Sequence, residues 1–228
     1  MTTPPDARGI RGHPGYAPGA GAGYAPGAGG DVFRILHVCT GNVCRSPMAE
    51  RLTRLGLVRR LGDGAAGMLV ESAGTWGHEG APMEAHAAAV LAEYGADPSG
   101  FTGRELLDDH VIDADLVLTA TLDHRSQVIS MGHAAGLRTF TLKEFTRLVR
   151  AIDTATLPEG SVTERARALV RAAAALRGWL LAPSPDADEV SDPYGAPISY
   201  FRSIGAEIHD ALEPTVTALT GVAATVQT

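Results

Sequence analysis

Residues 35–47 read ILHVCTGNVCRSP, and this stretch decides the fold of the chain. The run 33–38 is short and mostly apolar and leads into Cys39, which predicts a buried β-strand. Gly41 and Asn42 predict a turn after the strand, because both residue types tolerate positive φ at low cost. The stretch is therefore expected to form a strand followed by a tight loop.

A helix is expected to begin directly after this loop. Pro47 fits the first helical position, where its missing N–H is no loss, and Ser46 is a candidate N-cap. The backbone N–H groups of the loop and of the helix start would then converge on one small volume. Because these groups and the helix dipole both favour negative charge, that volume suits a phosphate-sized anion.

Two side chains sharpen this expectation. Cys39 ends the strand next to a helix N-terminus and to Arg45, and both of these favour the thiolate, which is the nucleophilic form of cysteine. The planar guanidinium of Arg45 can hold two oxygens of a tetrahedral oxyanion. A nucleophile below a cradle of amides, with one arginine at the rim, is the chemistry of a phosphoryl-transfer site.

Composition and charge limit the class of protein. The 228 residues carry 19 basic and 26 acidic side chains, a net charge of −7, which argues against a general binder of nucleic acid or membrane surfaces. No apolar run of about 18 residues could span a bilayer, and no secretory signal begins the chain, so a cytoplasmic protein is expected. Two cysteines are too few for a disulfide framework, and no spacing suggests a metal site, so no cofactor is expected.

Residues 1–30 differ in composition from the rest of the chain. Within them, GYAPGAGA at 15–22 is followed by GYAPGAGG at 23–30, a near-perfect duplication. Gly, Pro and Ala at this density bury too little apolar area to offset chain entropy, so a disordered tail is expected. Tyr16 and Tyr24 leave open a docking or phosphorylatable role for the tail, beside a tolerated flexible extension.

Residues 31–228 are expected to form one α/β domain. Apolar runs predict three further strands, at 68–73, 114–119 and 138–142. Helices are predicted between the strands, at 48–61, 81–95, 103–110, 122–129 and 143–152. Strands that alternate with helices indicate a parallel sheet, whose ligand site lies beyond the carboxyl ends of the strands. Cys39 at the end of the first strand fits such a site.

Residues 153–190 depart from this alternation. The segment 162–181 is rich in Ala and Arg and strongly helix-prone, and 182–189 is a Pro- and Asp-rich connection. The region is interpreted as an insertion that carries its own helix, which either leans over the site and restricts substrates or is a structural cover. A long amphipathic helix is expected from Pro197, with a kink or break at Pro214.

The loop motif at 39–47, CTGNVCRSP, closely resembles the signature loop of the low-molecular-weight protein tyrosine phosphatases. A cysteine and an arginine separated by five residues would be a weak signal alone. The Gly-Asn pair, the second cysteine at position 44 and the trailing Arg-Ser-Pro make the signal specific. The resemblance covers about 32–150 and 190–220. It implies a four-stranded parallel sheet flanked by helices, a flavodoxin-like three-layer sandwich.

The resemblance also implies roles for four residues outside the loop. Ser72, in the Ser-Ala pair after the second strand, would brace the loop through hydrogen bonds, and Trp76 would line the pocket wall. Asp192, in an Asp-Pro-aromatic sequence before the last helix, would be the general acid. Tyr194 would form one wall of the substrate slot. On its own, Asp-Pro-Tyr-Gly at 192–195 is an ordinary turn.

Within the loop, the resemblance implies the reaction of a protein tyrosine phosphatase. Cys39 would attack phosphorus and form a cysteinyl-phosphate, while Arg45 and the amides of 40–45 hold the oxygens. Asp192 would protonate the leaving phenol, and Ser46 would donate a hydrogen bond to the Cys39 sulfur. The remaining loop residues expected at the substrate are Thr40, Gly41, Asn42, Val43 and Cys44.

Cys44 has a further role implied by the resemblance. Its place in the loop permits a reversible disulfide with Cys39 under oxidation, which would shield the nucleophile from irreversible oxidation. The alternative is that Cys44 only packs.

Three other functions remain open. Arsenate reductases of the same fold resemble this loop but use two further cysteines near 110–130, where this chain has none. Phosphoarginine hydrolases carry a threonine just before the second cysteine of the loop, where this chain has Val43. A non-catalytic phospho-binding module is disfavoured because Cys39, Arg45 and Asp192 are all present.

The expected partner is a phosphotyrosine protein, and the expected state of the chain is a monomer. A bacterial tyrosine kinase, an exopolysaccharide export partner and a host protein are all open as the physiological substrate. Neither nucleic acid nor a membrane is expected to bind.

Overall fold

β1 (Phe33–Cys39) lies inside a four-stranded sheet whose strand order is β2–β1–β3–β4. The computed structural model describes residues 32–222, so the tail expected at 1–30 lies outside the described residues. All neighbouring strands run parallel, as the alternation of strands and helices predicts. The other strands are β2 (Met68–Gly74), β3 (Leu116–Thr119) and β4 (Thr139–Thr141).

The helices connect and cover these strands. Two of their starts follow from capping boxes, Thr141 with Glu144 at α5 and Ser161 with Glu164 at α6, in which side chains satisfy the first free N–H groups. The α-helices of residues 32–222 are α1 (Arg45–Leu61), α2 (Ala85–Glu93), α3 (Asp108–Asp113), α4 (Leu122–Met131), α5 (Leu142–Arg150), α6 (Val162–Leu176) and α7 (Ile198–Thr220). Short 3₁₀ turns are η1 (Gly62–Gly67), η2 (His133–Leu137), η3 (Thr154–Thr156) and η4 (Pro185–Asp188).

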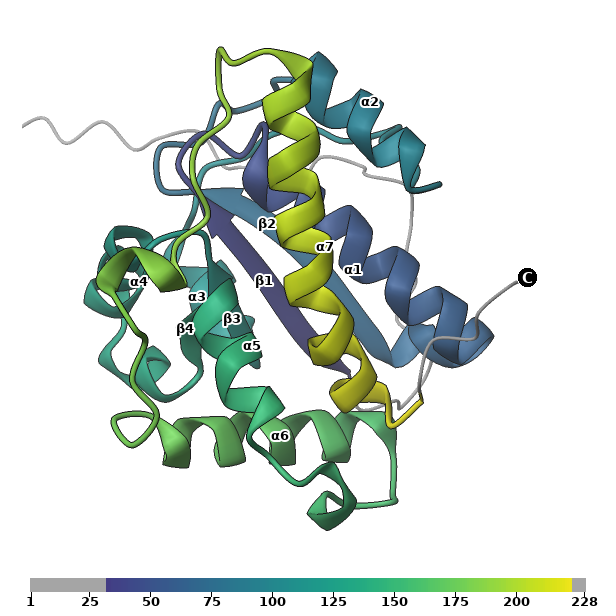
Figure 1. Cartoon of the computed structure of the whole chain (residues 1–228), viewed down its shortest axis with the longest axis vertical. Helices are drawn as coiled ribbons and strands as arrows, with labels where there is room; N and C mark the ends of the chain where they lie inside the picture. The colour runs from purple at the N-terminus through teal and green to yellow at the C-terminus, as the bar shows by residue number, and fades with distance from the viewer. Residues whose placement is uncertain (1–31, 223–228) are drawn as a thin grey trace, which may run out of the picture. The chain divides into compact units, whose positions relative to one another are not determined.

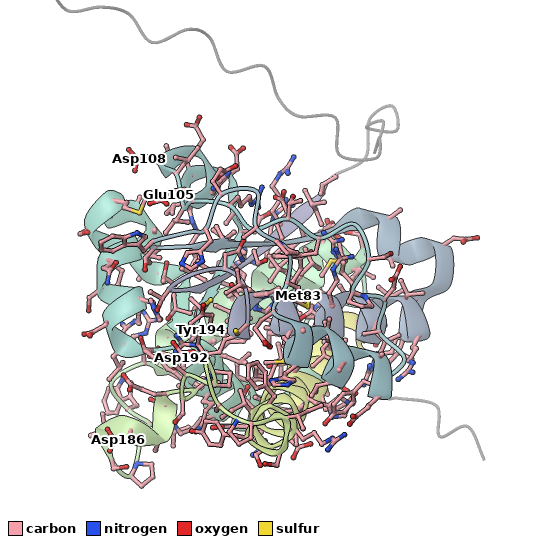
Figure 2. All side chains as sticks on the ribbon, turned by 90° about the horizontal axis from the view of Figure 1, so that it is seen from above. Met83, Glu105, Asp108, Asp186, Asp192 and Tyr194 are labelled. Carbon is pink, nitrogen blue, oxygen red and sulfur yellow. The ribbon has the colours of Figure 1, made fainter. Side chains whose placement is uncertain are left out.

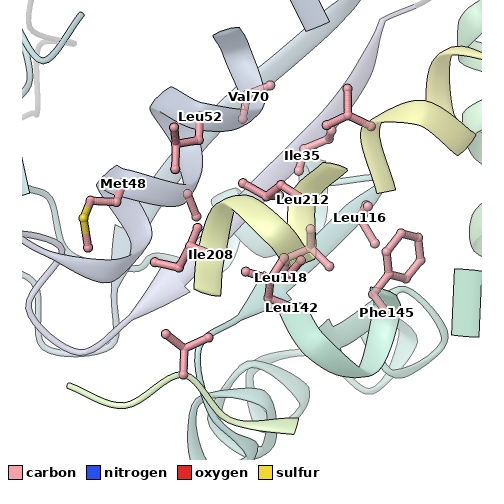
Figure 3. Packing of buried hydrophobic residues seen from close by; sticks show 14 of the residues in the cluster. Ile35, Met48, Leu52, Val70, Leu116, Leu118, Leu142, Phe145, Ile208 and Leu212 are labelled. Carbon is pink, nitrogen blue, oxygen red and sulfur yellow. The ribbon is translucent and has the colours of Figure 1, made fainter. Parts of the chain in front are cut away.

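Successive side chains of β1 point to opposite faces of the sheet and so divide the core into two clusters. Ile35 belongs to the larger cluster, with residues of α1, α5 and α7, whereas Leu36 and Val38 pack with residues of α3 and α4. Figure 1 shows α7 running in front of the sheet between α1 and α5. In the close view of the larger cluster, Ile35 and Leu116 of the sheet meet Leu212 of α7 (Figure 3). Helices therefore cover both faces, which confirms the expected fold class.

The start of α1 differs from the expectation. The helix begins at Arg45 rather than at Pro47, so Cys44 occupies the N-cap position and makes no side-chain cap bond. Ser46 lies inside the first turn and is not the N-cap. Pro47 fits the third helical position as well as the first, because the first four N–H groups of a helix have no intrahelical partner.

The helix expected at 103–110 is wrong in its first half. There the chain runs beside the end of β2, with Gly74 N–H donating to Arg104 O at 3.0 Å and Leu106 N–H donating to Gly74 O at 2.8 Å. This parallel bridge holds the segment extended, and α3 starts only at Asp108. A pairing over this sequence distance leaves no mark in the local helical pattern.

The region 153–190 contains α6, which ends at Leu176, earlier than the expected 181. Its interpretation as an insertion stays a prediction. α7 runs through Pro214 to Thr220, so a break at Pro214 is wrong, whereas a kink there stays a prediction. Apolar residues on both sides of the proline are buried in the core. No helix within residues 32–222 is long and apolar enough to cross a bilayer.

Candidate active site

The loop between β1 and α1 lies at the carboxyl end of the sheet, where parallel sheets bind their ligands. Cys39 is the last residue of β1 and is 2% exposed. Arg45 is the first residue of α1 and is 5% exposed. The two candidate catalytic residues therefore stand at the two ends of the loop 40–44, one on a strand and one on a helix.

The backbone of the loop is fixed from within and from one side. Asn42 has a φ of 52°, a left-handed conformation that asparagine adopts more readily than most residues. Residues 75–78 donate three N–H groups to carbonyl oxygens of 39–41, at 2.9 to 3.0 Å. At Gly74 the two segments approach so closely that a Cβ atom would lie 2.3 Å from the Thr40 carbonyl oxygen, so only glycine fits there.

A buried chain of hydrogen bonds, which we name the inner network, holds the turn of the loop. It joins Cys39, Ser46, Asn42, Ser72 and Glu50. Cys39 Sγ lies 3.0 Å from Ser46 Oγ. The Asn42 amide donates to Ser46 Oγ and to Ser72 Oγ, at 2.9 Å each. The Ser72 hydroxyl donates to Glu50 Oε2 at 2.6 Å, which completes the chain from the sulfur to a carboxylate.

The partners at the far side of the inner network set the direction of its bonds. The Glu50 carboxylate can only accept, and Arg104 N–H occupies Asn42 Oδ1 at 2.9 Å, so the Asn42 amide nitrogen points at the two hydroxyls. Ser46 Oγ accepts from Asn42, so its own proton is available to the Cys39 sulfur at 3.0 Å, while the Ala73 carbonyl oxygen at 3.4 Å is a second, more distant acceptor. Such a donor stabilises a thiolate.

A second set of contacts, the outer network, surrounds the guanidinium of Arg45. It consists of Arg45, Thr40, Asp192, Val190 and His124. Arg45 Nη2 donates to Asp192 Oδ2 at 2.7 Å and to Thr40 Oγ1 at 3.2 Å. Arg45 Nη1 donates to the carbonyl oxygen of Val190 at 3.2 Å, and Thr40 Oγ1 also lies 2.9 Å from His124 Nε2. The loop is thus joined to the segment before α7 and to α4.

Two groups near this guanidinium have displaced pKa values. Burial, and secondarily the charge of Arg45, lowers the pKa of His124 to about 4, so its imidazole is neutral at pH 7. Burial, and secondarily Cys39, raises the pKa of Cys44 to about 12, so Cys44 is a thiol at that pH. Both cysteines are unpaired in the structure, and the Cys39–Cys44 disulfide stays a prediction.

A cavity of about 150 Å³ opens beside the loop. Figure 2 looks onto this end of the protein and shows Asp192 and Tyr194 next to each other near the middle of the face. The cavity is lined by Cys39, Thr40, Gly41, Val43, Cys44, Arg45, His78, Asp192 and Tyr194. The structure therefore brings together most of the predicted site residues, from two separate parts of the sequence, and a third part adds His78. Asn42, Ser46 and Ser72 lie buried beneath them.

Trp76 does not lie where the resemblance implies. Its side chain is 76% exposed, and it is not among the residues that line the cavity. The lining residue from this segment is His78, and a Cβ atom on Gly41 would lie 3.5 Å from its Nε2 atom. The segment contacts the loop through its backbone, which leaves the indole of Trp76 in solvent.

The sequence did not reveal four residues of this region: Glu50, His78, His124 and Val190. Glu50 lies four residues after Ser46 on α1, so the helical period could have placed both on one face. His124 follows the N-cap residue Thr121 at the start of α4, but no local pattern connects it to a loop 84 positions earlier. Within residues 32–222, no three His, Cys, Asp or Glu side chains come together as a metal site.

The Cys39 thiol lies at the end of a parallel strand, and the Arg45 guanidinium lies at the start of the next helix. Both line one small cavity, and this arrangement is typical of a cysteine-based phosphatase. The chain belongs to the low molecular weight phosphotyrosine protein phosphatase family, which matches residues 34–159. This match confirms the resemblance carried by the loop motif.

Relatives and solved structures agree with the family. A protein-arginine-phosphatase of Geobacillus stearothermophilus is 37% identical over 113 residues, 50% of this chain and 71% of that protein. The low molecular weight protein-tyrosine-phosphatase Etp of Escherichia coli K12 is 41% identical over 97 residues, 42% of this chain and 60% of that protein. The YwlE arginine phosphatase structure from Geobacillus stearothermophilus aligns with a TM-score of 0.59 at 28% identity, over 83% of this chain and 94% of that chain.

Proposed function

We propose that this protein is a protein tyrosine phosphatase that hydrolyses phosphotyrosine in proteins through a cysteinyl-phosphate. The proposal is carried by the convergence of Cys39, Arg45 and Asp192 on one cavity, although Asp192 is 147 positions from Arg45. Cleavage of a phosphate monoester needs a nucleophile, a positive field for the phosphoryl oxygens and a proton for the leaving group. These three side chains supply one requirement each.

In the first step, the Cys39 sulfur attacks phosphorus while the bond from phosphorus to the phenolic oxygen breaks. The Ser46 hydroxyl, 3.0 Å from the sulfur, stabilises its anionic form before the attack and again when the sulfur leaves. Arg45 and the loop N–H groups hold the three non-bridging oxygens. The bonds of Asn42 to Ser46 and Ser72 keep the loop in the shape that this requires.

Asp192 is the proposed general acid. Its Oδ2 accepts from Arg45 Nη2 at 2.7 Å, and its Oδ1 accepts from Tyr194 N–H at 3.1 Å. A phosphate in the loop competes for the same guanidinium, because Arg45 binds phosphate oxygens and carboxylate oxygens alike. The carboxylate that the phosphate displaces takes up a proton from solvent, and as a carboxylic acid it protonates the departing phenolate. It then removes a proton from the water that hydrolyses the cysteinyl-phosphate and releases inorganic phosphate.

The walls of the cavity support an aromatic substrate. Val43 and Tyr194 both line it, and Tyr194 is 65% exposed, so its ring is accessible from solvent. An apolar side chain and an aromatic ring offer favourable contacts to the phenyl ring of phosphotyrosine.

Protein arginine phosphatase is the second candidate function. It is supported by the relative and by the structure from Geobacillus stearothermophilus, both named arginine phosphatases. In that branch a threonine is expected just before the second cysteine of the loop, and Val43 takes its place here. Because valine has no oxygen to accept a hydrogen bond from a guanidino group, Val43 favours phosphotyrosine. Arsenate reduction has less support, because 110–130 holds no cysteine for a disulfide relay.

Parallel assays on the purified full chain test these alternatives. Initial rates are compared on a phosphotyrosine peptide and a phosphoarginine peptide with the same flanking sequence, with thioredoxin-coupled arsenate reduction as the third assay. We expect the phosphotyrosine peptide to be preferred by at least about tenfold in kcat/KM, a difference that one buried polar contact can produce. Val43→Thr is the matched variant, and it should shift the ratio toward phosphoarginine. A reversed preference in the unmodified chain would replace the first proposal with the second.

The cellular setting belongs to the same proposal. A nucleophilic thiol persists where disulfides are rare, and both cysteines are unpaired, which supports the cytoplasm. A bacterial tyrosine kinase is the proposed substrate protein, and release of phosphate from an autophosphorylated kinase by the unmodified chain, but not by Cys39→Ser, is the assay.

A further inference from the structure

We propose that the Thr40 hydroxyl binds the substrate phosphate and that His124 is the positioning residue that turns the Thr40 proton toward it. This assignment rests on the proposed function, because it concerns how the same loop holds a phosphate. It adds a side-chain donor to the backbone amides and Arg45, and it assigns a role to a buried histidine that the reaction does not otherwise use.

The contacts of Thr40 Oγ1 carry the first step. It lies 3.2 Å from Arg45 Nη2, which can only donate, and 2.9 Å from His124 Nε2. A hydroxyl oxygen has two lone pairs and one proton. If His124 also donates from Nε2, both lone pairs of Thr40 are occupied, and its proton is free for a third partner.

The contacts of Thr121 decide which nitrogen of His124 carries the proton. Thr121 Oγ1 accepts from the His124 backbone N–H at 3.3 Å and lies 2.7 Å from Nδ1. With the ring proton on Nε2, the Thr121 hydroxyl donates to Nδ1, and the hydroxyl proton left without a partner among these residues is that of Thr40, which is exposed. With the ring proton on Nδ1, Thr40 donates to Nε2, and the proton left without a partner is that of Thr121, which is half-buried. The first tautomer is therefore the better satisfied one, because an exposed hydroxyl can donate to water or to a ligand.

The charge state of the ring is consistent with this arrangement. His124 is buried, and burial is the larger cause that lowers its pKa, ahead of the Arg45 charge. Asp123 and Asp192 act in the opposite direction but do not overcome it. A neutral imidazole donates through one nitrogen and accepts through the other, which is what Thr40 and Thr121 require.

The position of Thr40 supplies the third partner for its proton. Thr40 lines the cavity and is exposed, whereas His124 behind it is buried and is not part of the lining. A phosphate that binds above Cys39 and beside Arg45 therefore meets the Thr40 hydroxyl. The hydrogen bond to an anionic oxygen is charge-assisted, and its loss should weaken phosphate binding by about 10- to 100-fold.

The test measures the affinity for inorganic phosphate, as the inhibition constant of a competitive inhibitor and as the dissociation constant from calorimetry. This affinity can be interpreted even if the preferred substrate is not phosphotyrosine. Thr40→Val keeps the shape of the side chain but removes the hydroxyl, and Thr40→Ser keeps the hydroxyl. We expect the dissociation constant for phosphate to rise about 10- to 100-fold in Thr40→Val and to stay within about threefold in Thr40→Ser. Unchanged phosphate affinity in Thr40→Val would overturn the assignment of Thr40.

A double-mutant cycle tests the part of His124. His124→Leu removes the donor, and His124→Gln places an amide N–H near the position of Nε2. We expect His124→Leu to weaken phosphate binding, His124→Gln to restore most of it, and the pair Thr40→Val with His124→Leu to bind no more weakly than Thr40→Val alone. Additive losses would show that His124 does not act through Thr40.

Nuclear magnetic resonance of the unmodified chain tests the tautomer, even if His124→Leu fails to fold. Long-range proton–nitrogen correlations of the imidazole should show a protonated Nε2 and an unprotonated Nδ1 at pH 7. A protonated Nδ1 would reverse the direction of the Thr40 bond and overturn the proposal.

Discussion

The inner and outer networks hold the same loop from two sides, and they differ in burial and in origin. Every member of the inner network is buried, and its members come from β1, the loop, α1 and the adjacent strand β2. The outer network includes two exposed residues, Thr40 and Asp192, and it draws on the start of α4 and the segment before α7. One network is closed to solvent, and the other opens onto the cavity.

This difference indicates that the two networks have separate roles. In the inner network, each polar atom already has a partner, so an incoming phosphate has nothing to displace there. In the outer network, the Arg45–Asp192 ion pair uses a guanidinium that the phosphate also needs, so binding must rearrange it. The buried network preserves the shape of the loop, and the accessible one exchanges its partners with the substrate.

The largest expected effect comes from the residue that belongs to the inner network and also lines the cavity. Cys39→Ser replaces the sulfur with a poorer nucleophile of similar size and should lower kcat on an aryl phosphate by at least about 10⁴-fold. Because both networks remain, the variant should still bind inorganic phosphate, which calorimetry would measure. Turnover that survives the substitution would remove Cys39 as the nucleophile.

The next effect separates the outer network from the inner one. Asp192→Asn cannot protonate a leaving group, so kcat should fall about 10²- to 10⁴-fold on a phenyl phosphate with a poor leaving group. An activated aryl phosphate leaves without that proton, so its kcat/KM, which reports only the step that forms the cysteinyl-phosphate, should stay close to that of the unmodified chain. The plot of log kcat/KM against leaving-group pKa is the measurement, and equal losses of kcat/KM on both substrates would reject the role of Asp192 as the acid.

The two networks also differ in how far they could be predicted from the sequence. Asn42 and Ser46 lie within the loop motif, and the resemblance assigned Ser72 to the bracing of the loop, so local pattern and resemblance together indicated these three residues. Asp192 came only from the resemblance, since its own sequence reads as a turn. His124 could not be predicted, because its contact with Thr40 depends on how α4 begins relative to β1.

The fold shows the same limit. Apolar runs and their alternation with helices predicted the four parallel strands, because these patterns are local. The bridge between Gly74 and Glu105 was missed, and with it the true start of α3, because pairing partners far apart leave no periodic signal. Trp76 was placed in the pocket by resemblance alone, whereas its ring is exposed and His78 lines the cavity.

A smaller effect is expected when the inner network loses its central member but keeps its backbone. Asn42→Gly removes the bonds to Ser46 and Ser72, while glycine adopts the φ of 52° without strain. We expect kcat to fall about tenfold or more, since a misplaced loop loses part of the transition-state contacts. Asn42→Ala should lose the same activity and, in addition, about 1 kcal/mol of unfolding free energy from the left-handed alanine. Equal stability of the two variants would argue against backbone strain at this position.

The smallest effect concerns stability and leaves the chemistry aside. His37 lies on β1 beside the inner network, where its Nε2 donates to Thr53 Oγ1 at 3.0 Å, and burial, then the Arg54 charge, lowers its pKa from 6.5 to about 3. Between pH 6.5 and about 3, His37 is protonated in the unfolded chain but not in the folded chain. Stability is therefore full above that pH and is lost as the pH falls toward 3.

Urea unfolding at pH 7, 6 and 5 measures this loss. His37 should contribute on the order of 1 to 2 kcal/mol of destabilisation between pH 7 and pH 5, and His124 in the outer network, with its pKa lowered to about 4, should contribute a similar amount. His37→Gln should remove the contribution of His37 to the pH dependence of the unfolding free energy and leave the contribution of His124 unchanged. A dependence of the unfolding free energy on pH that His37→Gln leaves unchanged would show that the folded chain does not oppose protonation of His37.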